Sequence, residues 1–260
     1  MRIALVHNPE AGSGDHHGPS LIDRVRAAGH DAEYASTEAE SLTNALADSP
    51  DVVLAAGGDG TVAAVARLIS ASGRDVSLAI LPIGTANNIA RSLGIPSDVD
   101  AVLAGLATAR IAPLDVGLVS APWGKARFVE SAGVGLFGEM LQHAAVGASV
   151  RPESGTGDAK PRRGTRMLRM LERGVAAPWH VNADGQDLSG EYLMVVAMNT
   201  AHIGPALALA PDADAGDGAL DLLLVAEEHR PALGDYLEAV TRDEDPRIAI
   251  PMRRVQTLRL

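Results

Sequence analysis

The sequence predicts an α/β domain with a parallel sheet, followed by a second, mostly antiparallel β domain. In the first part, short apolar runs alternate with segments of helical periodicity, which is the pattern of a parallel sheet covered by helices on both faces. Beyond residue 112, strand-like runs follow one another between Gly and Pro turns. We place the boundary near residue 120 and expect domains at residues 1–120 and 121–260.

The elements of the first domain can be placed in order along the chain. Strands are expected at residues 2–7, 31–34, 52–56 and 76–81, and helices at 20–28, 41–47, 62–72 and up to about residue 93. Parallel sheets bind ligands at the carboxyl ends of their strands. The two glycine loops that follow the third and fourth strands are therefore candidate ligand-binding segments.

The first glycine loop is the segment Gly57–Thr61 (GGDGT), between a buried strand and a helix. This order aims backbone N–H groups and the positive end of a helix dipole at one point, which favours phosphate binding. Asp59 can hold a phosphate-bound Mg²⁺ or orient a hydroxyl, and Thr61 can cap the helix or donate to phosphate. An Asp-Gly hairpin would need a second strand, whereas residues 62–72 have helical periodicity.

The second glycine loop spans residues 81–91 (LPIGTANNIAR) and leads into the next helix. Gly84, Thr85, Asn87 and Asn88 are small or polar residues near that helix start. Simple N-capping by Thr85 or Asn87 remains an open alternative. Two similar loops in successive βα units favour a ligand that both loops share.

In the second domain a helix is expected at residues 135–145, and strands at 114–120, 125–132, 179–183, 192–198, 220–225 and 254–260. The segment 151–164 is rich in Gly, Pro, Ser and charge and is expected to be a loop. Residues 151–173 contain seven basic residues (Arg151, Lys160, Arg162, Arg163, Arg166, Arg169 and Arg173) and three acidic ones (Glu153, Asp158 and Glu172). A solvated helix face and a contact with anionic lipid are both compatible with this charge.

The composition fits a globular chain and excludes several functions. The chain has 260 residues, 47% hydrophobic and 21% charged, with a formal net charge of −11. This acidity argues against a nucleic-acid partner. The absence of cysteine excludes disulfides, thiolate metal sites and cysteine nucleophiles. With neither a signal-like start nor a membrane-spanning apolar run, we expect a cytoplasmic protein that can still act peripherally at the inner membrane face.

Four motifs, in this order, resemble the diacylglycerol kinase catalytic-domain family, in its soluble bacterial lipid-kinase branch related to sphingosine and ceramide kinases. They are Asn8–Gly12 (NPEAG), Gly57–Thr61, Leu81–Pro96 and Pro211–Asp221 (PDADAGDGALD). The GGDGT motif alone also occurs in NAD kinases and phosphofructokinases. The resemblance extends across almost the whole chain.

The resemblance implies an ATP-binding N-terminal domain and a β-sandwich C-terminal domain that holds the lipid. The implied nucleotide-site residues are Asn8, Thr37, Gly57, Gly58, Asp59, Gly60, Thr61, Val62, Ala63, Gly84, Thr85, Asn87 and Asn88. The resemblance also implies a Mg²⁺ site formed by Asp217 with the backbone carbonyls of Asp214 and Ala219, because a hard cation prefers oxygen ligands. An Asp-rich turn without an ion is an equal alternative, and Asp221 is assigned to the following strand.

Three departures from the family pattern bear on catalysis. The family usually has Asp where this chain has the neutral Asn88, and a basic residue where residues 13–16 (SGDH) stand. The family's expected general base belongs to an Asp-Gly-Glu segment that would begin about where this sequence stops, at Leu260. Asp59 is therefore the remaining candidate catalytic residue. We expect the chain to bind ATP and to turn over poorly.

These observations predict an ATP-dependent, Mg²⁺-using kinase of a diacylglycerol-like lipid hydroxyl, with a role in phospholipid metabolism. Two alternatives stay open: a catalytically degenerate member that binds nucleotide or lipid, and a kinase of a soluble substrate such as NAD. The sequence leaves open which lipid is used and whether the chain forms a homodimer.

Overall fold

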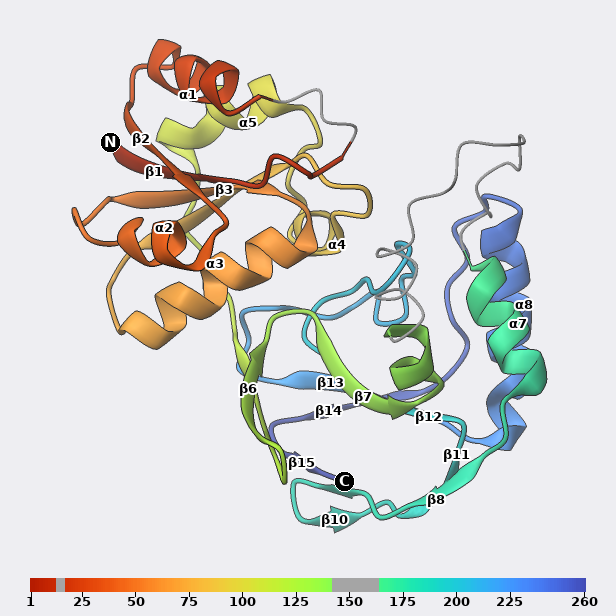
Figure 1. Ribbon diagram of the computed structural model, residues 1–260. Coiled ribbons are helices and arrows are strands. Elements are labelled where there is room, and N and C mark those ends of the chain that lie inside the picture. Colours follow the sequence, from red (N-terminus) through yellow and green to blue (C-terminus); the bar gives the residue numbers. More distant parts are fainter. Residues whose placement is uncertain (13–16, 142–163) are drawn as a thin grey trace. The chain divides into compact units, whose positions relative to one another are not determined.

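The computed structural model describes residues 1–12, 17–141 and 164–260 (Figure 1). The chain divides into two compact units, Met1–Glu130 and Ser131–Leu260. A hairpin of β5 (Gly117–Ala121) and β6 (Gly124–Phe128) belongs to the first unit. The expected strand at 125–132 is thus interrupted, since β7 (Ser131–Gly135) starts the second unit.

The first unit is built on a four-stranded parallel sheet, as the sequence predicts. Its strands are β1 (Arg2–His7), β2 (Asp31–Ser36), β3 (Val52–Gly57) and β4 (Ser77–Pro82). The strand order is β2-β1-β3-β4, with β3 in register with both β1 and β4. The carboxyl ends of β1, β3 and β4 therefore open at the same edge of the sheet.

Helices cover both faces of this sheet (Figure 1), which explains why β3 is buried along its whole length, whereas the edge strand β2 carries exposed polar residues. One face packs against α1 (Gly18–Ala27) and α5 (Val99–Gly105). A short 3-10 turn, Leu106–Thr108, follows α5. The other face packs against α2 (Ala39–Asn44), α3 (Asp59–Ser72) and α4 (Asn88–Ser92). In β1, Ile3 and Leu5 face the first group and Ala4 and Val6 the second.

Two features of the first unit differ from the sequence-based expectation. The α3 helix begins at Asp59 rather than Val62, because Gly58 is already extended and serves as the N-cap. Asp59 and Thr61 therefore lie in the first helical turn. Helix α5 was not predicted; its signals are the Asp98 cap, whose Oδ1 accepts from the Ala101 N–H at 2.7 Å, and the buried residues Val99 and Leu103.

The second unit contains a four-stranded antiparallel sheet in the order β14-β13-β12-β7. Its members after β7 are β12 (Met194–Met198), β13 (Leu220–Val225) and β14 (Met252–Val255). One face of the sheet packs against shorter strands and their neighbours. These strands are β8 (Ala177–Trp179), β9 (Asn182–Ala183), β11 (Gly190–Tyr192) and β15 (Leu258–Arg259), and the exposed strand β10 (Gln186–Asp187) pairs with β9.

Helices α7 (Thr165–Arg173) and α8 (Arg230–Thr241) pack together against the other face of that sheet (Figure 1). Helix α8, which follows a 3-10 turn at Glu227–His229, was not predicted. Residues 136–141 are helical, as expected for the start of the helix at 135–145, whose remainder lies outside the described residues. No helix within the described parts of the chain is long and apolar enough to cross a membrane.

Candidate active site

Three loops meet at the carboxyl edge of the parallel sheet, and their contacts require glycine. A Cβ added to Gly84 would lie 2.3 Å from the Cα of Gly58, so the two glycine loops touch through their backbones. Gly12, at a φ of +68°, would place a Cβ 2.2 Å from the carbonyl oxygen of Ile83. The loops after β1, β3 and β4 therefore close on one another only because these positions lack side chains.

The three loops line an open cavity of about 340 Å³, which we call the three-loop cavity. This volume lies within the range of small-molecule sites. The cavity is lined by Asn8, Glu10, Ala11, Gly12, Thr37, Gly58, Gly60, Thr61, Ala64, Gly84 and Thr85. The structure thus brings together residues from all three predicted loops, together with Thr37 from beyond β2. Of the lining residues, Glu10, Ala11, Gly12 and Ala64 were not predicted as ligands.

Other predicted nucleotide-site residues support the loops without lining this cavity. Gly57 makes room for Thr61, because a Cβ there would lie 2.3 Å from Thr61 Oγ1. Val62 is buried in the core and Ala63 packs against the same cluster. Residues 13–16, where the family usually has a basic residue, lie outside the described residues.

Asn87 shapes the second glycine loop through its own side chain. Its backbone is left-handed, at a φ of 53°. Its Oδ1 accepts from the Gly84 N–H at 3.0 Å, and its Nδ2 donates to the carbonyls of Pro82 and Gly84, both at 2.9 Å. The amide therefore holds the loop closed, and its predicted contact with nucleotide remains a prediction.

Asp59 connects the first turn of α3 to α4. Its Oδ1 accepts from the backbone N–H of Ile89 at 2.9 Å, which supplies a partner for a donor at the start of that short helix. An ionised carboxylate has about four acceptor sites, so this bond leaves further acceptor capacity. Asp59 is half-buried and does not line the three-loop cavity, so its predicted catalytic role remains a prediction.

A second carboxylate near Asp59, that of Glu130, was not predicted. The Nδ2 of buried Asn88 donates to Glu130 Oε1 at 3.0 Å. The preceding residue, Val129, is 1% exposed and packs in the core cluster that also contains Val62 and Ile89. Burial, followed by the negative charge of Asp59, raises the pKa of Glu130 to about 7, while the Asn88 hydrogen bond opposes the shift.

The acidic loop Pro211–Asp221 of the second unit is held by its own backbone and by arginines. Asp214 Oδ1 accepts from the Gly216 N–H at 3.0 Å, and Asp217 Oδ1 accepts from the Ala219 N–H at 2.9 Å. The other oxygen of Asp217 pairs with Arg254. A cation bound by Asp217 would therefore compete with a guanidinium, and the predicted Mg²⁺ site remains a prediction.

Two further observations concern the pKa of Asp221 and the arrangement of acidic and histidine side chains in the described residues. Burial, together with the negative charge of Asp212, raises the pKa of Asp221, which lies in β13 as expected. Across residues 1–12, 17–141 and 164–260, no cluster of three or more His, Asp or Glu side chains is arranged to hold a metal ion.

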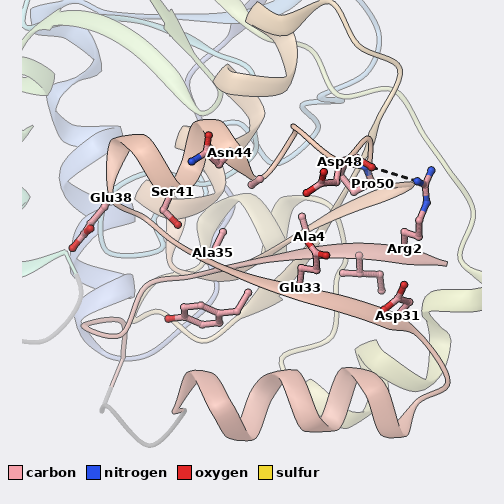
Figure 2. Close-up of a pocket in the computed structure, with 13 residues that line it drawn as sticks. Arg2, Ala4, Asp31, Glu33, Ala35, Glu38, Ser41, Asn44, Asp48 and Pro50 are labelled. Carbon is pink, nitrogen blue, oxygen red and sulfur yellow. Dashed lines mark hydrogen bonds between the residues drawn. The ribbon is translucent and has the colours of Figure 1, made fainter.

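A cavity of about 410 Å³ lies elsewhere in the first unit, beside β2 and α2 (Figure 2). Among the residues that line it are four acids, Asp31, Glu33, Glu38 and Asp48. Arg2, the cationic residue among its described lining residues, donates to the Asp48 carbonyl at 3.3 Å. This charge is unfavourable for a polyphosphate, and the cavity includes none of the predicted site residues.

Comparison with known proteins agrees with this architecture. The family model described as "Diacylglycerol kinase catalytic domain" matches residues 2–119, and "YegS C-terminal NAD kinase beta sandwich-like domain" matches residues 159–245. A diacylglycerol kinase of Bacillus subtilis (strain 168) is 27% identical over 252 residues, covering 92% of this chain and 78% of that protein. One from Staphylococcus haemolyticus (strain JCSC1435) is 26% identical over 248 residues, covering 92% and 72% respectively.

The fold is also similar to solved structures. A crystal structure of a diacylglycerol kinase from Bacillus anthracis str. Sterne superposes with a TM-score of 0.71 at 23% identity, covering 99% of this chain and 84% of that one. The chain thus combines a kinase-type α/β domain with a β-sandwich related to that of NAD kinases. It belongs to the diacylglycerol kinase catalytic-domain family. The names of its relatives support a kinase function in general terms.

Proposed function

We propose that this protein is an ATP-dependent lipid kinase that transfers the γ-phosphate of ATP to the hydroxyl of a diacylglycerol-like lipid. The observation that supports this most is the closure of three glycine-containing loops around the three-loop cavity, beside the N-terminus of α3. Backbone N–H groups and a helix dipole together favour bound phosphate. The lipid as acceptor follows from the names of the relatives.

In this proposal the residues of the cavity have distinct roles toward ATP. Gly58, Gly60 and Gly84 let the phosphates approach the backbone, because no Cβ intervenes. The hydroxyls of Thr61 and exposed Thr85 donate to phosphate oxygens. Bound Mg²⁺ would neutralise charge on the β- and γ-phosphates, as phosphoryl transfer requires. Asp59, at the start of α3, orients the acceptor hydroxyl.

We further propose that α7 brings the protein to anionic membranes. Met167 and Leu171 are buried, whereas Arg166, Arg169 and Arg173 are exposed. These three arginines recur at helical spacing, so they share one side of α7. Charge of this kind attracts the protein to anionic lipid, at about 1 kcal/mol per residue. The remaining basic residues of the 151–173 segment lie outside the described residues.

The test of the proposed function compares acceptors for labelled phosphate. The chain should transfer label from γ-labelled ATP to diacylglycerol in mixed vesicles, and should leave NAD unlabelled. ATP binding, measured separately by calorimetry, distinguishes a degenerate binder from a kinase. Binding without transfer to any acceptor would replace the proposal with the degenerate-member alternative, and transfer to NAD alone would replace it with a soluble-substrate kinase.

A further inference from the structure

Glu130 stands where three elements of the first unit converge. It lies two residues beyond the end of β6, and α3 packs against both β6 and α4. Buried Val129 fixes the backbone on its N-terminal side within the core. The Asn88 amide fixes the carboxylate itself, through the 3.0 Å bond to Oε1. The position of Glu130 is therefore set by packing and by a hydrogen bond, in a half-buried setting that retains some solvent access.

Asp59 and Asn88 both make hydrogen bonds at the start of α4, and both affect the pKa of Glu130. Asp59 Oδ1 accepts from the Ile89 N–H, while the neighbouring residue Asn88 donates to Glu130. From α3 the negative charge of Asp59 acts on Glu130, and from α4 the neutral amide of Asn88 donates a hydrogen bond to it. Two carboxylates are thus held on one short helix start, and the residue between them is uncharged.

We propose that Glu130 is the proton acceptor of the phosphoryl-transfer site and supplies the acid that is absent at Asn88. This inference rests on the proposed function. In the step, the O–H bond of the lipid hydroxyl breaks and its proton passes to the Glu130 carboxylate. The hydroxyl oxygen forms a bond to the γ-phosphorus, the bond from that phosphorus to the bridging oxygen breaks, and ADP leaves with the electron pair.

The chemistry of Glu130 suits this role better than that of an ordinary surface carboxylate. A general base works best when its pKa lies near the operating pH. Burial and the charge of Asp59 raise the pKa of Glu130 to about 7 from 4.5. Paired carboxylates that titrate apart are a recurrent acid–base arrangement. The poor turnover expected from a neutral Asn88 is therefore not the outcome that this geometry favours.

The first experiment substitutes Glu130→Gln in the full chain. Glutamine retains an oxygen that can accept from Asn88 Nδ2 but cannot take up the proton. We expect kcat to fall by about 10²–10⁴-fold, with ATP affinity unchanged. In the wild type, kcat should rise with pH through about 7, as Glu130 becomes ionised; this limb should be lost in the variant. Glu130→Asp should retain the limb at a reduced rate, and Glu33→Gln, at an exposed position of β2, is the matched control.

A second measurement does not need activity. The carboxyl carbon of Glu130, followed by NMR, should titrate near pH 7 in the wild type and at lower pH in Asp59→Asn, because the repelling charge is gone.

The outcomes separate the two proposals. A wild type that transfers phosphate to no lipid hydroxyl overturns the proposed function and, with it, proton transfer to Glu130. An active wild type whose Glu130→Gln variant keeps both kcat and the limb near pH 7 overturns only the role of Glu130. If Glu130→Gln has a lowered melting temperature and reduced activity but kcat still rises with pH near 7, Glu130 has only a structural role. A titration near 4.5 that ignores Asp59→Asn removes the paired-carboxylate arrangement itself.

Discussion

The three-loop cavity of the first unit and the acidic loop of the second unit were both predicted from motifs, but the structure treats them differently. In the first unit, residues distant in sequence converge, because parallel strands bring the ends of β1, β3 and β4 to one edge. In the acidic loop, the carboxylates of Asp214 and Asp217 turn back to their own backbone, and Asp217 also meets Arg254. A motif thus indicates a site most firmly when the fold joins it to other motifs.

The largest effect on phosphoryl transfer is expected from Asp59→Asn. Asparagine retains a carbonyl that can accept from the Ile89 N–H, so the melting temperature should stay close to that of the wild type. Loss of the carboxylate should reduce transfer by at least 10²-fold, roughly the contribution of a positioned acid–base group. Transfer rates and melting curves of both proteins provide the check; activity within tenfold of the wild type, at equal stability, would remove Asp59 from the site.

Reversing the charge of α7 should weaken membrane binding by the second unit without affecting nucleotide binding by the first unit. The triple variant Arg166→Glu, Arg169→Glu and Arg173→Glu removes about 3 kcal/mol of attraction to anionic lipid, which is roughly hundredfold in vesicle affinity at low salt. ATP affinity should be unchanged. Sedimentation with phosphatidylserine vesicles measures the effect. Equal binding by variant and parent would mean that these arginines are a solvated helix face.

The close contact between the two glycine loops of the first unit can be tested by adding a methyl group. In Gly84→Ala the new methyl group would lie 2.3 Å from Gly58 Cα, so the loops must separate. We expect a loss of about 1–3 kcal/mol in the free energy of unfolding, together with weaker ATP binding. Gly105→Ala is the control, because a Cβ there meets nothing within 4 Å and its φ is −80°. If chemical denaturation gives the two variants equal stabilities, backbone contact between the loops is not what requires glycine.

The smallest effect is expected in the acidic loop. If Mg²⁺ uses Asp217, Asp217→Asn should raise the Mg²⁺ concentration for half-maximal transfer severalfold, since a hard cation prefers a charged oxygen ligand. Arg254→Gln should lower it, because the competing guanidinium is gone. Titration of activity with Mg²⁺ at saturating ATP measures both. Identical curves for both variants and the wild type would leave the loop as an Asp-rich turn.

Much of the fold follows from local sequence patterns, whereas the supporting contacts of the site do not. The strands of the first unit are short apolar runs with clear ends, and the GGDGT loop has the order strand, turn, helix, so both could be predicted. Helix α8 was missed because the surrounding strand-like runs suggested an all-β region. The Asn88–Glu130 hydrogen bond joins residues 42 positions apart, and no local sequence pattern at Glu130 predicts it. The role of Asn87 depends on a left-handed backbone that Asn tolerates but does not require.

The most direct test of the nucleotide site is amide hydrogen exchange with and without Mg²⁺ and ATP. We predict that ATP adds protection to residues 8–12, 57–61 and 84–88, the loops that supply lining residues of the three-loop cavity, and adds none to residues 31–35 beside the acidic cavity. Protection of residues 31–35 in place of the three loops, or of the acidic loop Pro211–Asp221 alone, would contradict the assignment of ATP to the first unit's glycine loops.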